Sequence, residues 1–186
     1  MDKKNLMKFP KLAQVQILWG LAGIILFSAS AFTFLKGENA LVEIAPYLGL
    51  SMLFSGLINI YIYRRTEKSL HGSHWLLADG VSTSLLSLFL LFNQMIQAAL
   101  IPFFLGVWEL FTGILKLLDC KELKEDAVSG WRCFCLLGSI ELISGVASLL
   151  KPVDEFMGMN VVVAIILFIQ GCSYFFKIKI YLQLVK

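Results

Sequence analysis

Six long apolar stretches, separated by short polar segments, dominate the hydrophobic pattern of this chain. They cover about residues 12–35, 41–63, 73–93, 96–118, 130–150 and 157–177. A helix of ~20 apolar residues crosses the hydrocarbon core of a bilayer, so each stretch is long enough to span it. The pattern predicts an all-α polytopic membrane protein with six transmembrane helices.

Three of the connections between these stretches are short and consist of turn-forming residues. They follow the first, third and fifth stretches and contain Gly37-Glu38-Asn39, Asn93-Gln94 and Pro152-Val153-Asp154. The spans are therefore predicted to pair as three tight helical hairpins. The expected repeats cover about residues 12–66, 69–124 and 127–178 of one transmembrane domain, 12–178, with tails at 1–11 and 179–186.

Small residues recur at a seven-residue step in both helices of every hairpin. In the first helices they are Gly23 and Ser30, Gly80 and Ser87, and Gly138 and Gly145. In the second helices they are Gly49 and Gly56, Gly106 and Gly113, and Ala164 and Gly171. The two sets are separated by 26 residues in all six cases, which indicates three copies of one hairpin.

The seven-residue step has a physical reason. It is nearly two helical turns, so both small residues of a pair lie on one face of their helix. In lipid, helices associate through close van der Waals packing, which small side chains permit. The step suits a left-handed crossing of neighbouring helices. We therefore expect these positions to be helix-packing contacts.

Charge and composition agree with a membrane location. Hydrophobic residues make up 58% of the chain and charged residues 16%, whereas soluble domains have about 45–50% and 25%. Every Lys and Arg except Lys36 and Lys151 lies on one predicted side, which by the positive-inside rule is cytoplasmic. Both termini are then cytoplasmic. The first span has features of a signal peptide, but its apolar run continues to Leu35, so we expect it to be retained.

A tryptophan stands near the start of the first helix of each hairpin, at Trp19, Trp75 and Trp131, and is predicted to mark the membrane interface. With the paired small residues, the segment WLLADGVSTSLLSLFLLF at Trp75–Phe92 and the segment Trp131–Pro152, the chain resembles the short-repeat family typified by the acid-resistance membrane protein HdeD. The resemblance covers about residues 12–177. It departs from the family pattern at Ser87, where glycine is usual, and in the first two outer turns, which lack proline.

This resemblance implies a bacterial inner-membrane protein with six spans and a part in survival at low pH. It implies no catalytic residues. From it we expect a non-enzymatic protein that contributes to acid or envelope stress resistance, and the alternative is a small proton-linked transporter or channel. The expected partners are the lipid bilayer and a second copy or another membrane protein, and we expect no nucleic acid.

Four ionisable residues inside the predicted spans are candidate buried titrating residues, because a charge at the membrane centre costs about 2.5–3.5 kcal/mol on insertion scales. They are Asp79, Glu109, Lys116 and Glu141. Asp79 and Lys116 are predicted to form an ion pair between the third and fourth spans, and the alternative is a role in transport.

Glu109 and Glu141 occupy equivalent places, each three residues after a glycine of the packing face. If their two faces meet, the carboxyls could share a proton and serve as an acid sensor or proton relay. The alternative is that each is a protonated carboxyl that hydrogen-bonds to a neighbouring helix. Candidate partners for those bonds are Thr112, Ser139, Ser144 and Gln170.

Other reactive residues form no recognisable site. Cys120, Cys133, Cys135 and Cys172 contain no C-x-x-C pair, and we expect them to be structural. His71 and His74 are expected to be interface residues, with a metal or pH site as the alternative. No hydrolase, phosphate-binding or dinucleotide motif is present in the sequence, so neither a cofactor nor a metal is predicted.

Overall fold

The computed structural model describes residues 9–36, 41–65, 73–92, 100–125, 127–150 and 158–184. These residues form α2 (Phe9–Lys36), α3 (Leu41–Arg65), α4 (Ser73–Phe92), α5 (Leu100–Glu125), α6 (Trp131–Leu149) and α8 (Met159–Leu184). All six are long and apolar enough to cross a membrane, and the described residues contain no strand. The all-α, six-span prediction is confirmed.

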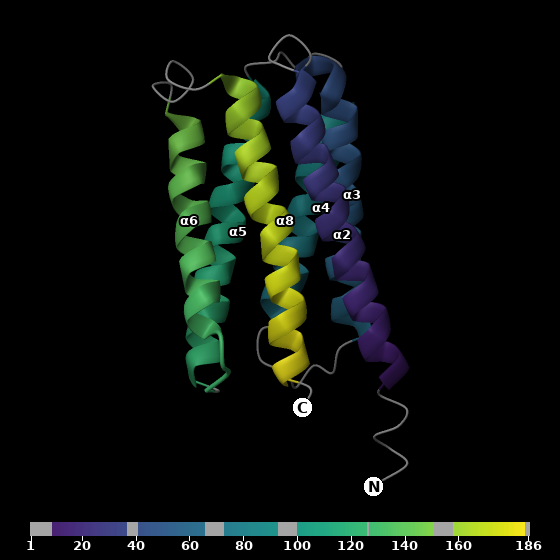
Figure 1. Ribbon diagram of the computed structural model, residues 1–186, viewed down its shortest axis with the longest axis vertical. Coiled ribbons are helices and arrows are strands. Elements are labelled where there is room, and N and C mark those ends of the chain that lie inside the picture. The colour runs from purple at the N-terminus through teal and green to yellow at the C-terminus, as the bar shows by residue number, and fades with distance from the viewer. Residues whose placement is uncertain are drawn as a thin grey trace, which may run out of the picture.

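The helices run as an upright bundle in which consecutive helices alternate in direction (Figure 1). We call the end of the bundle where α2 begins and α8 ends the terminal side, and the opposite end the far side. The predicted turn residues and His71 lie outside the described residues. Two helices are longer than their apolar runs, because α5 continues to Glu125 and α8 to Leu184.

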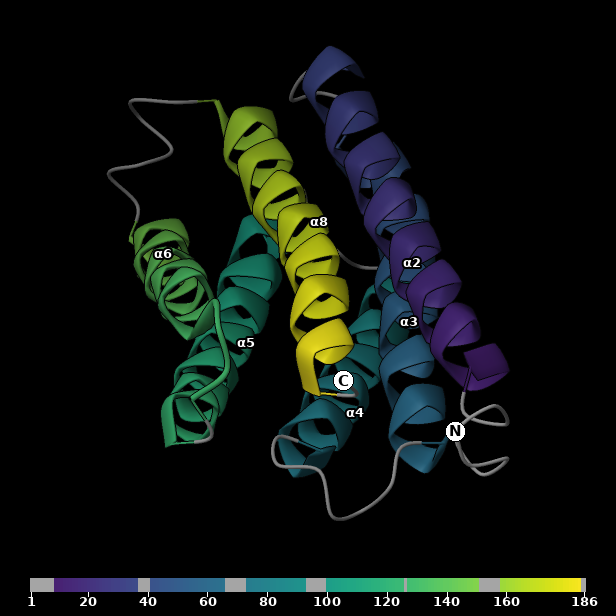
Figure 2. The same ribbon diagram turned by 60° about the horizontal axis from the view of Figure 1, so that its bottom comes forward.

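The closest helix pairs are not the predicted hairpins. Chain order gives α2–α3, α4–α5 and α6–α8, whereas the most extensive packing joins α3 to α4, α5 to α6, and α2 to α8. The helices of each predicted hairpin are also in contact, but less extensively than these three pairs, which join helices of different repeats. Figures 1 and 2 show the first and last of these helices, α2 and α8, side by side, so the third close pair joins the two ends of the described chain.

The small residues explain this pairing. A Cβ on Gly56 would lie 2.9 Å from the carbonyl oxygen of Gly80 on α4, and a Cβ on Gly113 would lie 2.9 Å from that of Gly138 on α6. Neighbours at this distance leave no space for a side chain, so the α3–α4 and α5–α6 backbones are in direct contact. The glycines of the predicted packing faces thus lie where these backbones approach each other.

The same register holds for all six pairs of facing small residues, two in each close helix pair. Gly49 packs near the Ser87 carbonyl, and a Cβ on Gly145 would lie 2.9 Å from the Gly106 carbonyl. In α2–α8, Ser30 Oγ donates a hydrogen bond to the Ala164 carbonyl at 2.7 Å. Gly23 and Gly171 close this contact against the rings of Phe175 and Phe27. Every pair thus joins the second helix of one repeat to the first helix of another.

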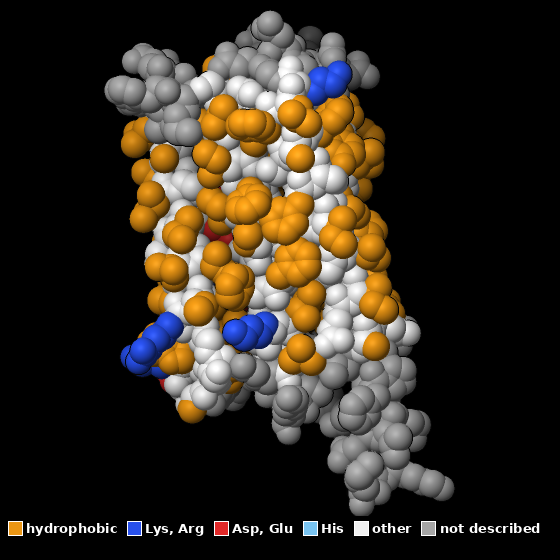
Figure 3. Space-filling model, in the orientation of Figure 1, with side chains coloured by type: hydrophobic (Ala, Val, Ile, Leu, Met, Phe, Trp, Pro, Cys, Tyr) orange, Lys and Arg blue, Asp and Glu red, His pale blue; other side chains and the backbone are white. Residues whose placement is uncertain are grey.

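The apolar core and the lipid-facing surface are separate. The main core cluster lies among α2, α3, α4, α5 and α8 and includes Trp19, Leu26, Met52, Trp108 and Leu167. Hydrophobic side chains cover the middle of the outer face, and Lys and Arg gather towards its two ends (Figure 3). This banding is what a bilayer requires. Trp19 belongs to the core at 3% exposure, so its prediction as an interfacial residue is wrong.

Candidate functional site

The last helix, α8, places a polar face against the interior of the bundle. Its polar side chains are spaced at i, i+3, i+4 and i+7, so they lie on one face of the helix. They are Gln170, Ser173, Tyr174 and Lys177. The first three are at most 2% exposed, and the side chain of Lys177 is 10% exposed. Buried polar groups need partners, and α3, α4, α5 and α6 supply them.

The Glu109–Glu141 cluster is the deeper of two polar clusters and is built between α5, α6 and α8. Lys116 Nζ donates to Glu141 Oε1 in a buried ion pair. Ser173 Oγ donates to the same oxygen at 2.6 Å. Lys116 Nζ also lies 3.4 Å from Gln170 Oε1. Glu141 is fully buried, so its charge depends on these contacts.

Glu109 completes this cluster and is also fully buried. Gln170 Nε2 donates to Glu109 Oε1 at 2.7 Å, and Ser144 Oγ donates to Glu109 Oε2 at 2.6 Å. The Gln170 amide also donates to Thr112 Oγ1 at 2.8 Å. Of the four predicted partners, Ser144 and Gln170 bond Glu109 directly and Thr112 bonds Gln170. Ser139 instead donates to the Cys135 carbonyl.

The structure brings Glu109 and Glu141 together in one network, but with Gln170 and Lys116 between them. The condition for this arrangement, that the two packing faces meet, is fulfilled by the contact of α5 with α6. With both carboxyls ionised and Lys116 protonated, the cluster holds one more negative charge than positive. One added proton makes it neutral.

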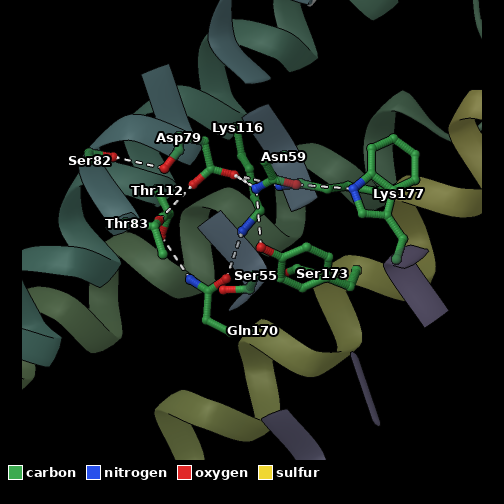
Figure 4. A network of polar contacts seen from close by, with 12 residues as sticks. Ser55, Asn59, Asp79, Ser82, Thr83, Thr112, Lys116, Gln170, Ser173 and Lys177 are labelled. Carbon is green, nitrogen blue, oxygen red and sulfur yellow. Dashed lines mark hydrogen bonds and ion pairs between the residues drawn. The ribbon is translucent and has the colours of Figure 1, made fainter. Parts of the chain in front are cut away.

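The Asp79 cluster lies nearer the terminal side, between α3, α4 and α8 (Figure 4). Lys177 Nζ donates to Asp79 Oδ2 at 2.6 Å, and Asn59 Nδ2 donates to the same oxygen at 2.9 Å. Asn59 in turn contacts Tyr174 Oη at 3.1 Å and accepts a bond from Trp19 Nε1 at 3.0 Å. One acid and one base therefore form a balanced ion pair.

The predicted ion pair between Asp79 and Lys116 is wrong, because each residue bonds a different partner. Asp79 belongs to the α3–α4 pair and Lys116 to the α5–α6 pair, and α8 bonds both. Lys177 was counted only among the charges of the cytoplasmic side, but it forms the ion pair with Asp79 inside the bundle. The reason is that α8 continues past its apolar run, which carries Lys177 along the packed part of the helix.

Several residues of the two clusters were not predicted. They are Asn59, Ser173, Tyr174 and Lys177. A signal for them is present in the sequence, because polar residues recur at three- or four-residue steps within otherwise apolar spans. Such steps give one polar face on α3 (Ser51, Ser55, Asn59) and one on α8.

Two buried side-chain oxygens among the described residues have no hydrogen-bond partner. They are Glu141 Oε2 and Asp119 Oδ1. Unpaired buried acceptors are uncommon in folded proteins and call for an explanation such as a water, an ion or a function. Both belong to helices of the α5–α6 pair.

Within the described part of the chain, the other candidates form no metal or disulfide site. No group of three or more His, Cys, Asp or Glu residues there could hold a metal ion. Cys120, Cys133, Cys135 and Cys172 are free thiols. His74 packs with Tyr63, whose ring centroid is 6.4 Å away.

Comparison with known proteins identifies the repeat. The family model described as "Short repeat of unknown function (DUF308)" matches twice, over residues 17–92 and 78–150. The two matches overlap within α4 and together cover most of the chain. Neither a curated protein nor a solved structure matches it. With its internal repeat and six apolar helices, the chain belongs to the DUF308 short-repeat family of integral membrane proteins.

Proposed function

We propose that this protein is a non-enzymatic integral membrane protein that contributes to acid or envelope stress resistance in the bacterial inner membrane, with both termini cytoplasmic. The resemblance to HdeD-type proteins and the membership of the short-repeat family support this proposal. The single observation that carries it is the Glu109–Glu141 cluster. A fully buried carboxyl, held by the neutral donors Gln170 and Ser144, lies beside a complete acid–base pair.

The mechanism is proton-dependent packing of the bundle. Glu141 already has Lys116 as its counter-charge, so the added proton belongs on Glu109. Protonation of Glu109 neutralises the cluster and removes a buried charge from the junction of α5, α6 and α8. Acidification then tightens the bundle, and a tighter bundle is the state that binds a partner or resists stress.

The expected pH dependence distinguishes the two glutamates. If the folded bundle binds a proton at Glu109 that the unfolded chain does not, stability rises as the pH falls, by up to about 1.4 kcal/mol per pH unit for one proton. Glu109→Gln cannot bind this proton, so the rise is lost. Glu141→Gln leaves Lys116 without its counter-charge and lowers stability at every pH.

Thermal unfolding of the purified protein in detergent, followed by circular dichroism across a pH series, measures both effects. Ser82→Ala on α4 is a suitable control, because Ser82 contacts the carbonyl of Asp79 and no residue of the Glu109–Glu141 cluster. A pH profile that is the same in the wild type and in both glutamate variants would contradict the mechanism.

The second candidate function is proton-linked transport, and the unpaired oxygens of Asp119 and Glu141 favour it. Transporters commonly break a helix at the membrane midplane. Here the prolines of the described helices lie near helix ends: Pro10 at the terminal-side end of α2, and Pro46 and Pro102 near the far-side ends of α3 and α5.

Liposomes that contain the protein and an enclosed pH-sensitive dye test this alternative. Transport predicts a proton flux above that of empty liposomes, and the flux should fall in Glu109→Gln. Flux no greater than in empty liposomes would remove the transport candidate and leave the packing mechanism in place.

A further inference from the structure

A continuous polar line runs along one face of α5. Its residues follow one another at steps of three or four, so they stack along the helix. From the terminal side inwards they are Glu122, Asp119, Lys116, Thr112 and Glu109. At 1.5 Å per residue, the line extends roughly 20 Å from the terminal end of α5 into the membrane.

The line ends at Glu109. Further towards the far side, the same face of α5 carries Leu105 and Ile101, and both are fully buried in the apolar core. Trp108 beside them is 1% exposed and donates its indole N–H to Thr83 Oγ1 at 2.8 Å. This face of α5 is therefore polar from the terminal side as far as Glu109 and apolar beyond it. The buried polar side chains nearer the far side are uncharged hydroxyls that donate to backbone carbonyls, namely Ser30, Thr33, Ser87 and Ser148.

Side chains of α4, α6 and α8 act on this polar line at successive positions along α5. At its outer end, Trp75 Nε1 of α4 donates to Glu122 Oε1 at 2.8 Å. At the next level, Asp119 lies within the electrostatic influence of Lys177 on α8 and Asp79 on α4, and of Glu122 and Lys116 on its own helix. At its inner end, the ionisable groups that act on Glu109 are Glu141 on α6 and Lys116.

The two unpaired oxygens belong to acids at this polar line: Asp119 is part of it, and Glu141 on α6 is the ion-pair partner of Lys116. Asp119 Oδ1 lies between the terminal side and Lys116, and Glu141 Oε2 belongs to the acid paired with Lys116. Each is a free acceptor in a place where a buried polar atom normally has a partner. An acceptor of this kind can receive a proton or a hydrogen bond from a water molecule.

We propose that the polar face of α5 is a one-sided access route by which protons reach Glu109 from the terminal side only. A hydronium ion at the terminal side protonates Asp119, and the proton passes through Glu141 to Glu109. Each transfer forms one O–H bond and breaks one, and the net change is a carboxylate at Glu109 converted to a carboxylic acid. The route rests on the proposed function. It adds to that function the side of the membrane whose pH sets the protonation state of Glu109.

The test is a pH step applied to one face of the membrane at a time. The full-length protein carries a C-terminal tag and is reconstituted into liposomes, which are sorted by capture into those with the tag outside and those with it inside. Infrared difference spectra then follow the carbonyl band of protonated carboxyl groups while the outer pH is changed and an impermeant buffer holds the inner pH. The part of the band that disappears in Glu109→Gln reports Glu109.

The expected result is a Glu109 band that appears when acid reaches the terminal side and does not appear when acid reaches the far side. In Asp119→Asn the band should rise roughly 10²-fold more slowly, because a positioned carboxyl speeds proton transfer by at least that factor. Glu125→Gln should behave as the wild type, since Glu125 is exposed at the same end of α5. Asp119→Glu should restore much of the rate.

Two results would overturn the route. A Glu109 band that follows the far side, or both sides equally, would refute one-sided access and leave proton binding by Glu109 intact. A Glu109 band that does not respond to acid on either side would overturn both the route and the proposed packing mechanism. The sidedness is measured on the wild type, and Glu109→Gln, in which a neutral amide of similar size replaces the carboxyl, serves only to assign the band.

Discussion

Replacement of Lys116 by methionine is expected to lower the free energy of unfolding by about 3–5 kcal/mol, because it leaves the buried carboxylate of Glu141 without its ion-pair partner. Glu141 is fully buried, and its carboxylate also accepts a hydrogen bond from the hydroxyl of Ser173. Methionine keeps much of the volume of lysine, so the change tests the charge more than the packing. Unfolding of the purified protein by an ionic detergent measures the loss.

Two further variants make this result specific. Lys121→Met removes an exposed lysine from the same helix and should have little effect. The double variant Lys116→Met with Glu141→Met should recover most of the lost stability, since replacement of both members of a buried ion pair by apolar residues is often neutral. Equal stability of Lys116→Met and Lys121→Met would show that the pair contributes nothing.

Substitution of Gly145 by alanine is the second change with a large expected effect, about 1–3 kcal/mol of lost stability. The added Cβ would lie 2.8 Å from the backbone nitrogen of Leu110 and 2.9 Å from the Gly106 carbonyl. A backbone cannot move aside as a side chain can, so α5 and α6 must separate. Separation also weakens the bond from Ser144 on α6 to Glu109 on α5.

Gly20 on α2 provides the matched control. A Cβ there would meet nothing within 4 Å, although Gly20 also lies inside a long helix. Gly20→Ala should therefore be neutral or stabilise the protein by about 0.5–1 kcal/mol, because alanine loses less backbone entropy than glycine. The same unfolding measurement compares the two variants. Equal effects of both substitutions would argue against close packing at Gly145.

The positions of the helices were largely contained in the sequence. Membrane spans can be predicted because lipid requires long apolar helices. The predicted ends were too early in α5 and α8, where the helix continues beyond its apolar residues. The small residues that share the 26-residue offset lie at the contacts of the three close helix pairs. It could not tell which helix each face meets, since equal offsets establish equivalence between repeats and not adjacency in space.

The contacts of the polar interior were predicted less well, because the sequence pattern again does not show which helices are adjacent in space. Glu109 and Glu141 could be placed together because both follow a glycine of a packing face. Asp79 was assigned the wrong partner because its partner, Lys177, lies 98 residues further along the chain. Lys177 was also counted among the surface charges, since the positive-inside rule counts charges near span ends without regard to the side of the helix they occupy.

The repeat also shows what is particular to Glu109. The equivalent positions in the other two repeats are Met52 and Leu167, and all three side chains are fully buried. Two of the three related sites are thus filled by ordinary core residues. The acid at the third requires Gln170 and Ser144 to satisfy it, which restricts the proton-binding chemistry to one part of a scaffold built from similar units.

The contact between α2 and α8 has a consequence for how the protein is made. α2 leaves the ribosome before the other described helices, and α8 leaves it after them. The small-residue face of α2 therefore has no partner helix in the membrane until α8 has been inserted. The same late helix brings Gln170 and Lys177 to the acids on α5 and α4. Until translation reaches α8, those acids lack these partners, so a chain that stops early holds two incompletely paired acids inside the membrane, which is energetically costly.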